Sequence, residues 1–196
     1  MLFRSYNIAT VYGISQLLGS DSTEVLTVLS RLEAVDGRFQ FTKSDSDITA
    51  IVDYAHTPDA LENVLKTIEN IRTRNEQVIT VVGCGGDRDA LKRPEMARIA
   101  CEMSDKVILT SDNPRTEDPA AILKQMEAGV EAHQTMKVLS ILDRDQAIKT
   151  AVSLAQPKDI VLIAGKGHEK YQDIQGVKHP FDDFEVVKNY FQKLQK

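Results

Sequence analysis

The stretch QVITVVGCGGDRD at residues 77–89 decides the fold class of this chain. Its first half is a nearly continuous run of β-branched residues, which is typical of a strand buried on both faces of a parallel sheet. A glycine-rich loop ends the run, and residues 93–103, RPEMARIACEM, follow with apolar side chains at helical spacing. A buried strand that leads through a loop into a helix is the repeating unit of a parallel sheet covered by helices.

The same unit recurs on both sides of this stretch. Short apolar runs predict further strands at residues 48–54, 106–111, 136–142 and 159–165. Helical periodicity predicts helices at residues 59–72, 119–132, 143–155 and 181–194. We therefore predict an α/β fold, with a mostly parallel sheet and helices on both of its faces.

The first residues of the chain have a different pattern. Apolar residues recur every three or four positions in residues 7–18 and again in residues 22–33, and Gly19 separates the two predicted helices. Two short helices cannot bury much apolar surface alone. We therefore expect residues 1–36 to be the tail of a larger domain and residues 37–196 to form the sheet domain.

The composition narrows the classes of function. The net charge of -5 argues against non-specific nucleic-acid binding, which needs a basic surface. Cys84 and Cys101 form no CxxC pair and belong to no Cys/His set with zinc spacing, so we expect a reducing cytoplasm and no metal site. No apolar run approaches the ~20 residues that cross a bilayer, and the start lacks the form of a signal peptide. We also expect a monomer that does not bind membranes.

Polar and glycine-rich residues gather at the ends of the predicted strands. Four loops carry them: residues 53–59, 83–89, 111–119 and 165–173. In open α/β sheets, ligands bind beyond the carboxyl ends of the strands. Four such loops on one edge of one sheet therefore predict a ligand site at that edge.

Arg88 follows the glycines of residues 83–89 and could hold a carboxylate or a phosphate with two parallel hydrogen bonds. The glycines would let the backbone approach a ligand closely. The alternative is a tight turn in which Arg88 pairs with Asp87 or Asp89. The loop is neither a GxGxxG fingerprint nor a GxxxxGK(S/T) phosphate-binding loop, and this disfavours a Rossmann-type oxidoreductase.

The DNPR stretch, residues 112–115, combines an amide with a guanidinium on a stiff loop. Pro114 fixes its own φ and pushes Asn113 toward an extended conformation. Asn113 and Arg115 held in this way suit the recognition of a zwitterionic amino acid. A helix start is the alternative, with Thr116 or Asp118 as the capping residue, and both can be true. The helix start leaves Asn113 and Arg115 without a role.

The GKGHE loop adds a further carboxylate. Gly165 and Gly167 make the loop flexible and rich in amides, and Glu169 could hold a ligand ammonium. His168 could titrate near neutral pH, but a lone histidine is more often structural or simply exposed.

Residues 53–59, DYAHTPD, suit a nucleotide. The start of the helix that follows favours anions through its dipole. Asp53 at the strand end could bind ribose hydroxyls, while His56 could stack on a base or only fill the turn. Upstream, Arg38 lies where the helical tail meets the sheet domain and could reach a phosphate.

Together the motifs DGRF, VDYAHTPDAL, VVGCGGDRDxxKRPxM, SDNPRTEDP and VLIAGKGHE resemble those of the UDP-N-acetylmuramoyl tripeptide synthetases of the Mur ligase family. They occur in the family's order, and the resemblance covers about residues 7–188. It implies three domains, of which residues 1–36 would end the central ATPase domain and residues 37–196 would be the whole Rossmann-like C-terminal domain. Residues 1–6 depart from the family's G-x-F-N-x-x-N motif, of which Asn7 is kept.

The family reaction is ATP-dependent amide formation. A substrate carboxylate is phosphorylated to an acyl phosphate, and the incoming amine attacks it through a tetrahedral intermediate. The resemblance therefore implies ligation of meso-diaminopimelate to the D-glutamate of UDP-N-acetylmuramoyl-L-alanyl-D-glutamate, a step of peptidoglycan synthesis. In this family a P-loop and a carbamylated lysine of the central domain hold ATP and Mg2+, and the present sequence lacks both. We therefore expect no catalytic residue in this chain and no turnover by the chain alone.

The resemblance also assigns binding residues. The expected diaminopimelate contacts are Arg88, Asp112, Asn113, Arg115, Gly165 and Glu169, and the expected ATP contacts are Arg38, Asp53 and His56. In this assignment Arg115 and Asn113 pair with the far carboxylate of diaminopimelate. Glu169 and the Gly165 carbonyl accept from its far ammonium, while Arg88 holds the carboxylate beside the reacting amine. Lysine lacks the far carboxylate and would leave Arg115 unsatisfied, which favours diaminopimelate.

Two alternatives remain open. The chain could be a non-catalytic module that binds an amino acid or a nucleotide. It could also belong to a related ligase that adds another amino acid or recycles cell-wall tripeptides, because Arg115 argues against lysine but not against every other acidic substrate.

Overall fold

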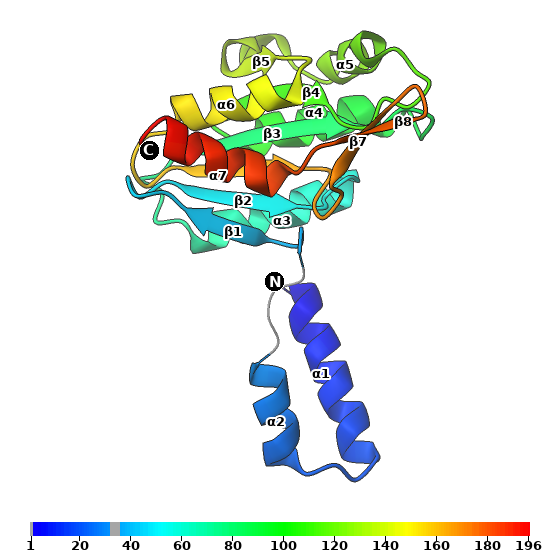
Figure 1. Cartoon of the computed structure of the whole chain (residues 1–196), viewed down its shortest axis with the longest axis vertical. Coiled ribbons are helices and arrows are strands. Elements are labelled where there is room, and N and C mark those ends of the chain that lie inside the picture. The colour runs from blue at the N-terminus through cyan, green and yellow to red at the C-terminus, as the bar shows by residue number, and fades with distance from the viewer. Residues whose placement is uncertain (1, 32–35) are drawn as a thin grey trace. The chain divides into compact units, whose positions relative to one another are not determined.

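The structure, a computed structural model, describes residues 2–31 and 36–196, with side chains from residue 7 onward. The chain divides into two compact units, Met1–Val35 and Asp36–Lys196 (Figure 1). Each unit is described by itself. Within the described residues, no helix is long and apolar enough to cross a membrane.

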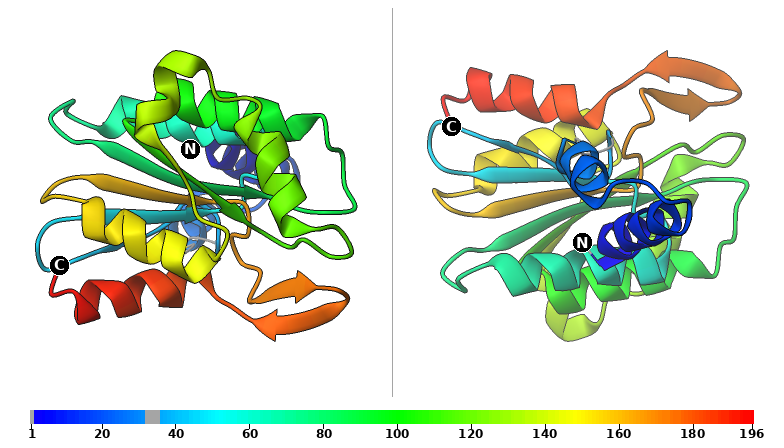
Figure 2. Two further views of the ribbon diagram at one scale, coloured as in Figure 1. Left: turned by 90° about the horizontal axis from the view of Figure 1, so that it is seen from above. Right: turned by 90° about the horizontal axis from the view of Figure 1, so that it is seen from below.

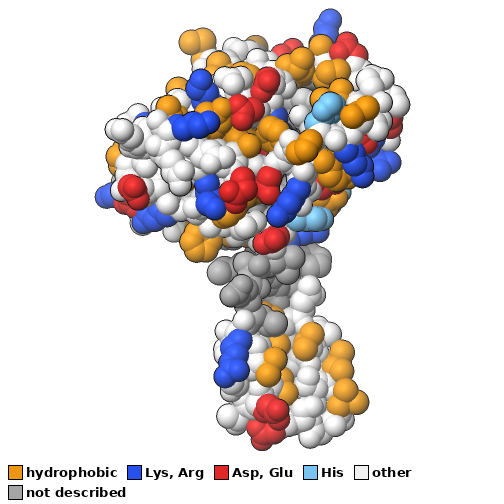
Figure 3. All heavy atoms as spheres, viewed as in Figure 1, with side chains coloured by type: hydrophobic (Ala, Val, Ile, Leu, Met, Phe, Trp, Pro, Cys, Tyr) orange, Lys and Arg blue, Asp and Glu red, His pale blue; other side chains and the backbone are white. Residues whose placement is uncertain are grey.

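The first unit holds two helices, α1 (Leu2–Leu17) and α2 (Ser22–Ser30). Gly19 ends the first helix with a positive φ of 78°. Asp21 begins the second helix, since its carboxylate accepts from the Glu24 N–H at 2.9 Å. Apolar side chains lie at the surface of this unit (Figure 3), and Leu17 is 88% exposed. Both helices were predicted, although α1 begins five residues earlier than expected, and the expected end of α2 lies outside the described residues.

The second unit alternates strands and helices. Its strands are β1 (Gln40–Lys43), β2 (Thr49–Asp53), β3 (Val78–Cys84), β4 (Lys106–Ser111), β5 (Val138–Ser140), β6 (Ile160–Ala164), β7 (Tyr171–Ile174) and β8 (Val177–Pro180). Its helices are α3 (Pro58–Ile71), α4 (Lys92–Met103), α5 (Pro119–Glu127), the 3-10 helix η1 (Ala132–Lys137), α6 (Arg144–Leu154) and α7 (Asp183–Lys193).

Six strands form the main sheet in the order β1-β2-β6-β3-β4-β5. All neighbours are parallel except β1, which pairs antiparallel with β2. Every residue of β3 and β6 is buried, as the continuous apolar runs predicted. The loops after β2, β6, β3 and β4 therefore leave the same edge of the sheet from adjacent strands.

Helices cover both faces of the sheet (Figure 2). The helices α3, α4 and α5 pack on one face, where Leu61 and Met96 meet Val82 of β3. The helices α6 and α7 pack on the other face, where Ile148 meets Val81 of the same strand. Successive residues of one strand thus serve two separate cores. The predicted α/β fold, with a mostly parallel sheet and helices on both faces, is confirmed.

Two elements, α5 and β5, are at least four residues shorter than predicted. The helix predicted at residues 119–132 ends at Glu127, two residues before Gly129, because glycine is unfavourable inside a helix. The strand predicted at residues 136–142 keeps only Val138–Ser140. It lies at the edge of the sheet and pairs with β4 alone, so few partners extend it.

The structure adds two strand pairings that the sequence did not predict. β1 is a short edge strand of mixed polarity. The strands β7 and β8 form a separate antiparallel hairpin. Its turn places Gln175 and Gly176 at φ values of 53° and 77°, as a type I′ turn requires.

A buried ion pair ties both helices of the second face to the edge of the sheet. Arg144 of α6 and Asp183 of α7 have side-chain exposures of 0%, and the guanidinium donates to the two carboxylate oxygens at 2.8 and 2.7 Å. Arg144 also donates to the Ala164 carbonyl at 3.1 Å and to the Ser111 carbonyl at 3.4 Å, at the ends of β6 and β4.

We predict that Asp183→Ala destabilises the fold by about 3–5 kcal/mol, because it leaves a buried guanidinium without its counter-ion. The free energy of unfolding from denaturant titration measures this change. Glu185→Ala on the same helix is the control, since Glu185 forms only an exposed pair with Lys188 at 3.2 Å. Its effect should stay within about 0.5 kcal/mol. Equal small effects of both substitutions would contradict the importance of the buried pair.

Candidate functional site

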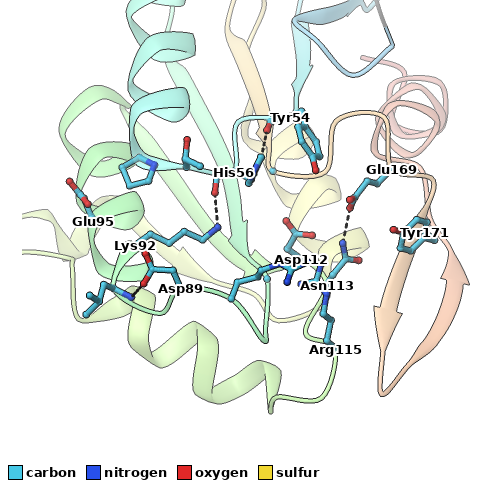
Figure 4. A pocket seen from close by; sticks show the side chains of 16 residues that line it. Tyr54, His56, Asp89, Lys92, Glu95, Asp112, Asn113, Arg115, Glu169 and Tyr171 are labelled. Carbon is cyan, nitrogen blue, oxygen red and sulfur yellow. Dashed lines mark hydrogen bonds between the residues drawn. The ribbon is translucent and has the colours of Figure 1, made fainter.

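A cavity of about 660 Å³ lies at the carboxyl edge of the sheet (Figure 4). The loops after β2, β3, β4 and β6 line it, which are the four loops that the sequence singled out. All six residues expected to bind the amino acid contribute to the lining: Arg88, Asp112, Asn113, Arg115, Gly165 and Glu169. Of the three residues expected to bind ATP, His56 lines this cavity, whereas Arg38 and Asp53 are not among its lining residues.

The Asn113 amide is oriented by partners within the protein. Its Nδ2 donates to the Glu169 carboxylate at 2.7 Å (Figure 4). Its Oδ1 accepts from Lys166 Nζ at 3.0 Å and from the Asp173 N–H at 2.9 Å. Since an amide nitrogen carries two hydrogens, Asn113 can hold Glu169 and still donate to a ligand.

Arg115 is held in place by the β7–β8 hairpin. Its backbone has a φ of 51°, which a non-glycine residue rarely adopts. The Arg115 N–H donates to the Asp173 carbonyl at 3.0 Å, and the Gln175 N–H donates to the Arg115 carbonyl at 2.7 Å. Its guanidinium donates to the Gly86 carbonyl at 2.8 Å. The hairpin therefore fixes the backbone of Arg115, and the loop after β3 holds its guanidinium.

The glycines after β3 allow two loops of the protein to approach each other. A Cβ at Gly86 would lie 1.9 Å from the Pro114 carbonyl oxygen, and a Cβ at Gly85 would lie 2.9 Å from Arg115 Nη1. The Gly86 N–H donates to the Asn113 carbonyl at 2.9 Å. These glycines therefore let the loop after β3 pack against the DNPR loop, and Gly85 also lines the cavity.

Arg88 lies exposed beside the cavity and makes one long contact, from Nη1 to the Asp87 carbonyl at 3.5 Å. The carboxylates that could have paired with it have other partners. Asp87 accepts from the Thr116 hydroxyl at 2.7 Å, and Asp89 accepts from the Leu91 N–H at 2.9 Å. Among the described residues, Arg88 therefore forms no ion pair with Asp87 or Asp89, and its guanidinium can face a ligand.

Arg93, which the sequence analysis did not single out, is the clamp between the same two loops. Its guanidinium is buried and donates to both carboxylate oxygens of Glu117 at 2.9 and 2.8 Å. It also donates to Gln125 Oε1 at 2.6 Å and to the Gly85 carbonyl at 3.2 Å. Its neighbour Pro94 at a helix start was visible in the sequence, but nothing marked this arginine as buried.

The charged groups at the base of the cavity are strongly desolvated. Asp112 is only 6% exposed, and its Oδ1 has no hydrogen-bond partner among the described residues. Burial raises the pKa of the Asp112 carboxyl, and the charges of Arg144 and Lys166 oppose this effect. A Cβ at Gly165 would lie 2.8 Å from Asp112 Oδ2, so the glycine makes room for this carboxylate.

Lys166 is a second residue that sequence reasoning missed. Between two glycines it read as part of a flexible loop, yet its side chain is 0% exposed and lies against Asn113. Burial lowers the pKa of its ammonium, and the Asp112 carboxylate opposes this effect. A partnered lysine inside a loop cannot be recognised without its tertiary contacts.

The residues expected to bind ATP gather around Tyr54. The Arg38 guanidinium lies 4.8 Å from the centroid of the Tyr54 ring, and the His56 ring lies 4.5 Å from it. Asp53 uses one carboxylate oxygen to accept from the Phe39 N–H at 2.7 Å. Burial raises the pKa of Asp53, and this hydrogen bond opposes the rise. In the described part of the chain, no group of three or more His, Cys, Asp or Glu side chains could hold a metal ion.

Comparisons with known proteins identify the family. Residues 37–167 match the family model for the Mur ligase, glutamate ligase domain. A UDP-N-acetylmuramoyl-L-alanyl-D-glutamate--2,6-diaminopimelate ligase of Cytophaga hutchinsonii is 58% identical over 194 residues, which is 99% of this chain and 40% of that relative.

Solved structures agree with this match. A structure of a UDP-N-acetylmuramoyl-L-alanyl-D-glutamate--2,6-diaminopimelate ligase superposes with a TM-score of 0.75 at 42% identity, covering 99% of this chain and 39% of that one. The MurF ligase from Thermotoga maritima in complex with ADP shares the fold, with a TM-score of 0.61 at 18% identity over 95% of this chain and 37% of that one. The chain spans about two fifths of the length of the curated relatives that it matches. This chain therefore belongs to the Mur ligase family.

Proposed function

We propose that this chain supplies the amino-acid site of a ligase that joins meso-diaminopimelate to the D-glutamate of UDP-N-acetylmuramoyl-L-alanyl-D-glutamate in peptidoglycan synthesis. The observation that carries the proposal is one cavity whose lining brings the guanidinium groups of Arg88 and Arg115 together with the carboxylates of Asp112 and Glu169. The name of the 58% identical relative describes a ligase for the same substrates.

The chemistry of diaminopimelate fits these groups. Each end of the molecule carries a carboxylate and an amine. Arg115 is assigned to the carboxylate of the far end, because a guanidinium forms paired hydrogen bonds with a carboxylate. Glu169 is assigned to the far ammonium, with the Gly165 carbonyl as a second acceptor. Arg88 is assigned to the carboxylate beside the amine that forms the new bond.

The same arrangement discriminates against lysine. Lysine offers the far ammonium but has no far carboxylate. Arg115, which is half-buried, would then face the cavity without an anion, and an unpaired charge in a partly desolvated place is costly. The hairpin and Gly86 hold Arg115, so it cannot easily turn away to water.

ATP is proposed as the energy source, consistent with the solved MurF relative that was determined with ADP. In this chain Arg38, Asp53 and His56 are the proposed nucleotide contacts, arranged around Tyr54. The Asp53 carboxylate also accepts a hydrogen bond from the Phe39 N–H, next to Arg38. Asp53 would therefore also help to place Arg38 for the nucleotide. For Mg2+, the described residues offer no cluster of ligands, so no step of the reaction is assigned to a metal held here.

Further features belong to the same proposal. The net charge of -5 supports a protein that does not bind nucleic acid. We propose a monomer that works in the cytoplasm, where its nucleotide-linked substrate is made. The alternatives are a non-catalytic binding module and a ligase for a different amino acid or for recycled peptides, which direct binding measurements separate.

We predict that the chain binds meso-diaminopimelate and not L-lysine in a calorimetric titration. Arg115→Ala should weaken diaminopimelate binding by about 10- to 150-fold, the equivalent of a lost charged hydrogen-bond pair. Arg98→Ala is the matched control, since Arg98 is exposed on α4 and pairs only with Glu102 at 2.6 Å. Equal binding of both amino acids would favour a different ligase or a non-selective module.

We also predict that Gly86→Ala weakens diaminopimelate binding by about 10-fold or more and destabilises the fold by about 1–3 kcal/mol. The added Cβ would overlap the Pro114 carbonyl and displace the loop that carries Arg115. Calorimetry and thermal melting measure the two effects. The control is Gly13→Ala, because nothing lies within 4 Å of a Cβ at that helical position. Unchanged affinity in Gly86→Ala would show that the loop contact does not place Arg115.

A further inference from the structure

Lys166 lies behind the wall of the cavity and touches three of the residues that line it. Its side chain is 0% exposed. Its Nζ donates to Asn113 Oδ1 at 3.0 Å and lies 3.7 Å from Asp112 Oδ1 and 3.6 Å from Glu169 Oε2. The Tyr171 ring centroid is 5.5 Å away. An ammonium in such a place is costly unless its partners compensate for the lost water.

The ammonium helps to determine which way the Asn113 amide points. Lys166 Nζ and the Asp173 N–H are both donors, and both meet the amide oxygen. A flipped amide would turn its NH2 group toward these two donors and its oxygen toward the Glu169 carboxylate. Both contacts would then be repulsive, so the observed orientation, with Nδ2 on Glu169, is fixed.

The ammonium also balances charge. Asp112 and Glu169 bring two carboxylates to one small volume, and Lys166 brings one cation between them. Their sum of one negative charge matches one ligand ammonium. Arg144 lies near Asp112 but is already paired with Asp183. Without Lys166, Asp112 and Glu169 would lose a cation that lies within 4 Å of both of them.

We propose that Lys166 is a positioning residue of the amino-acid site: it locks the Asn113 amide and balances the Asp112 carboxylate, so that Glu169 presents its charge to the ligand ammonium. The identity of that ligand rests on the proposed function. The amide lock and the charge balance are properties of the ligand-free protein.

The direction of the pH effect follows from the buried charges. Burial raises the pKa of Asp112, and Lys166 and Arg144 restrain the rise. Replacing Lys166 by an uncharged residue removes part of this restraint, so the Asp112 pKa rises further. Four charged groups act on the Lys166 ammonium: Asp112, Glu169, Arg144 and Asp183. A ligand ammonium prefers the ionised site, so its affinity for the variant should increase as the pH rises through that pKa.

The test uses Lys166→Met, which keeps the length of the side chain and removes its charge, with Lys149→Met as the control on an exposed position of α6. Carbon-13 NMR follows the Asp112 carboxyl in the ligand-free chain, assigned with Asp112→Asn. Calorimetry measures the affinity for meso-diaminopimelate over a pH series that spans the Asp112 titration found by NMR. We expect Asp112 to titrate at higher pH in Lys166→Met than in the unmodified chain. We also expect at least a 10-fold weaker affinity at the acidic end that recovers with pH, while the control behaves as the unmodified chain does.

An unchanged Asp112 titration would overturn the inference, whatever the ligand data show. A shifted titration with no diaminopimelate binding by any of the proteins would support the role of Lys166 and contradict the proposed function instead. If Lys166→Met does not fold, the double variant Asp112→Asn/Lys166→Met decides. If the double variant folds, the charge balance between Asp112 and Lys166 is supported. If the double variant does not fold either, the charge balance is overturned.

Discussion

The guanidinium of Arg144 is the point on which the ligand edge of this domain depends. It joins α6 to α7 through Asp183 and reaches the last carbonyls of β6 and β4. The residues that follow those carbonyls are Gly165 and Asp112, which line the cavity. Burying two charges costs desolvation free energy, and apolar residues could join the two helices without that cost. The use of two charges here places a fixed cation near the Asp112 carboxyl, where its charge opposes the rise in pKa that burial causes.

Much of the fold could be predicted because its central strands are buried on both faces. β3, β4 and β6 appear as unbroken apolar runs, and the helices between them have clear periodicity. β1, β7 and β8 are short, partly polar and stabilised by pairing with distant residues, so no local pattern marks them. For the site, the sequence predicted the four loops that line the cavity, and all six residues that it assigned to the amino acid lie in the lining. It could not show that Arg93 and Lys166 are buried, because charged residues in loops are normally solvated.

The β7–β8 hairpin, which the sequence did not predict, holds Arg115, which the sequence did assign to the site. Arg115 needs a φ of 51°, and two backbone hydrogen bonds from β7 and its turn supply the constraint. The adjoining Asn113 receives the Asp173 N–H from the same strand. The conformation of the DNPR motif therefore depends on pairing with β7, a segment about sixty residues later that has no clear sequence pattern. In the proposed function, the selection of an amino acid thus depends on backbone geometry as much as on the guanidinium, and a chain with the same DNPR residues but a different hairpin would not hold Arg115 in this way.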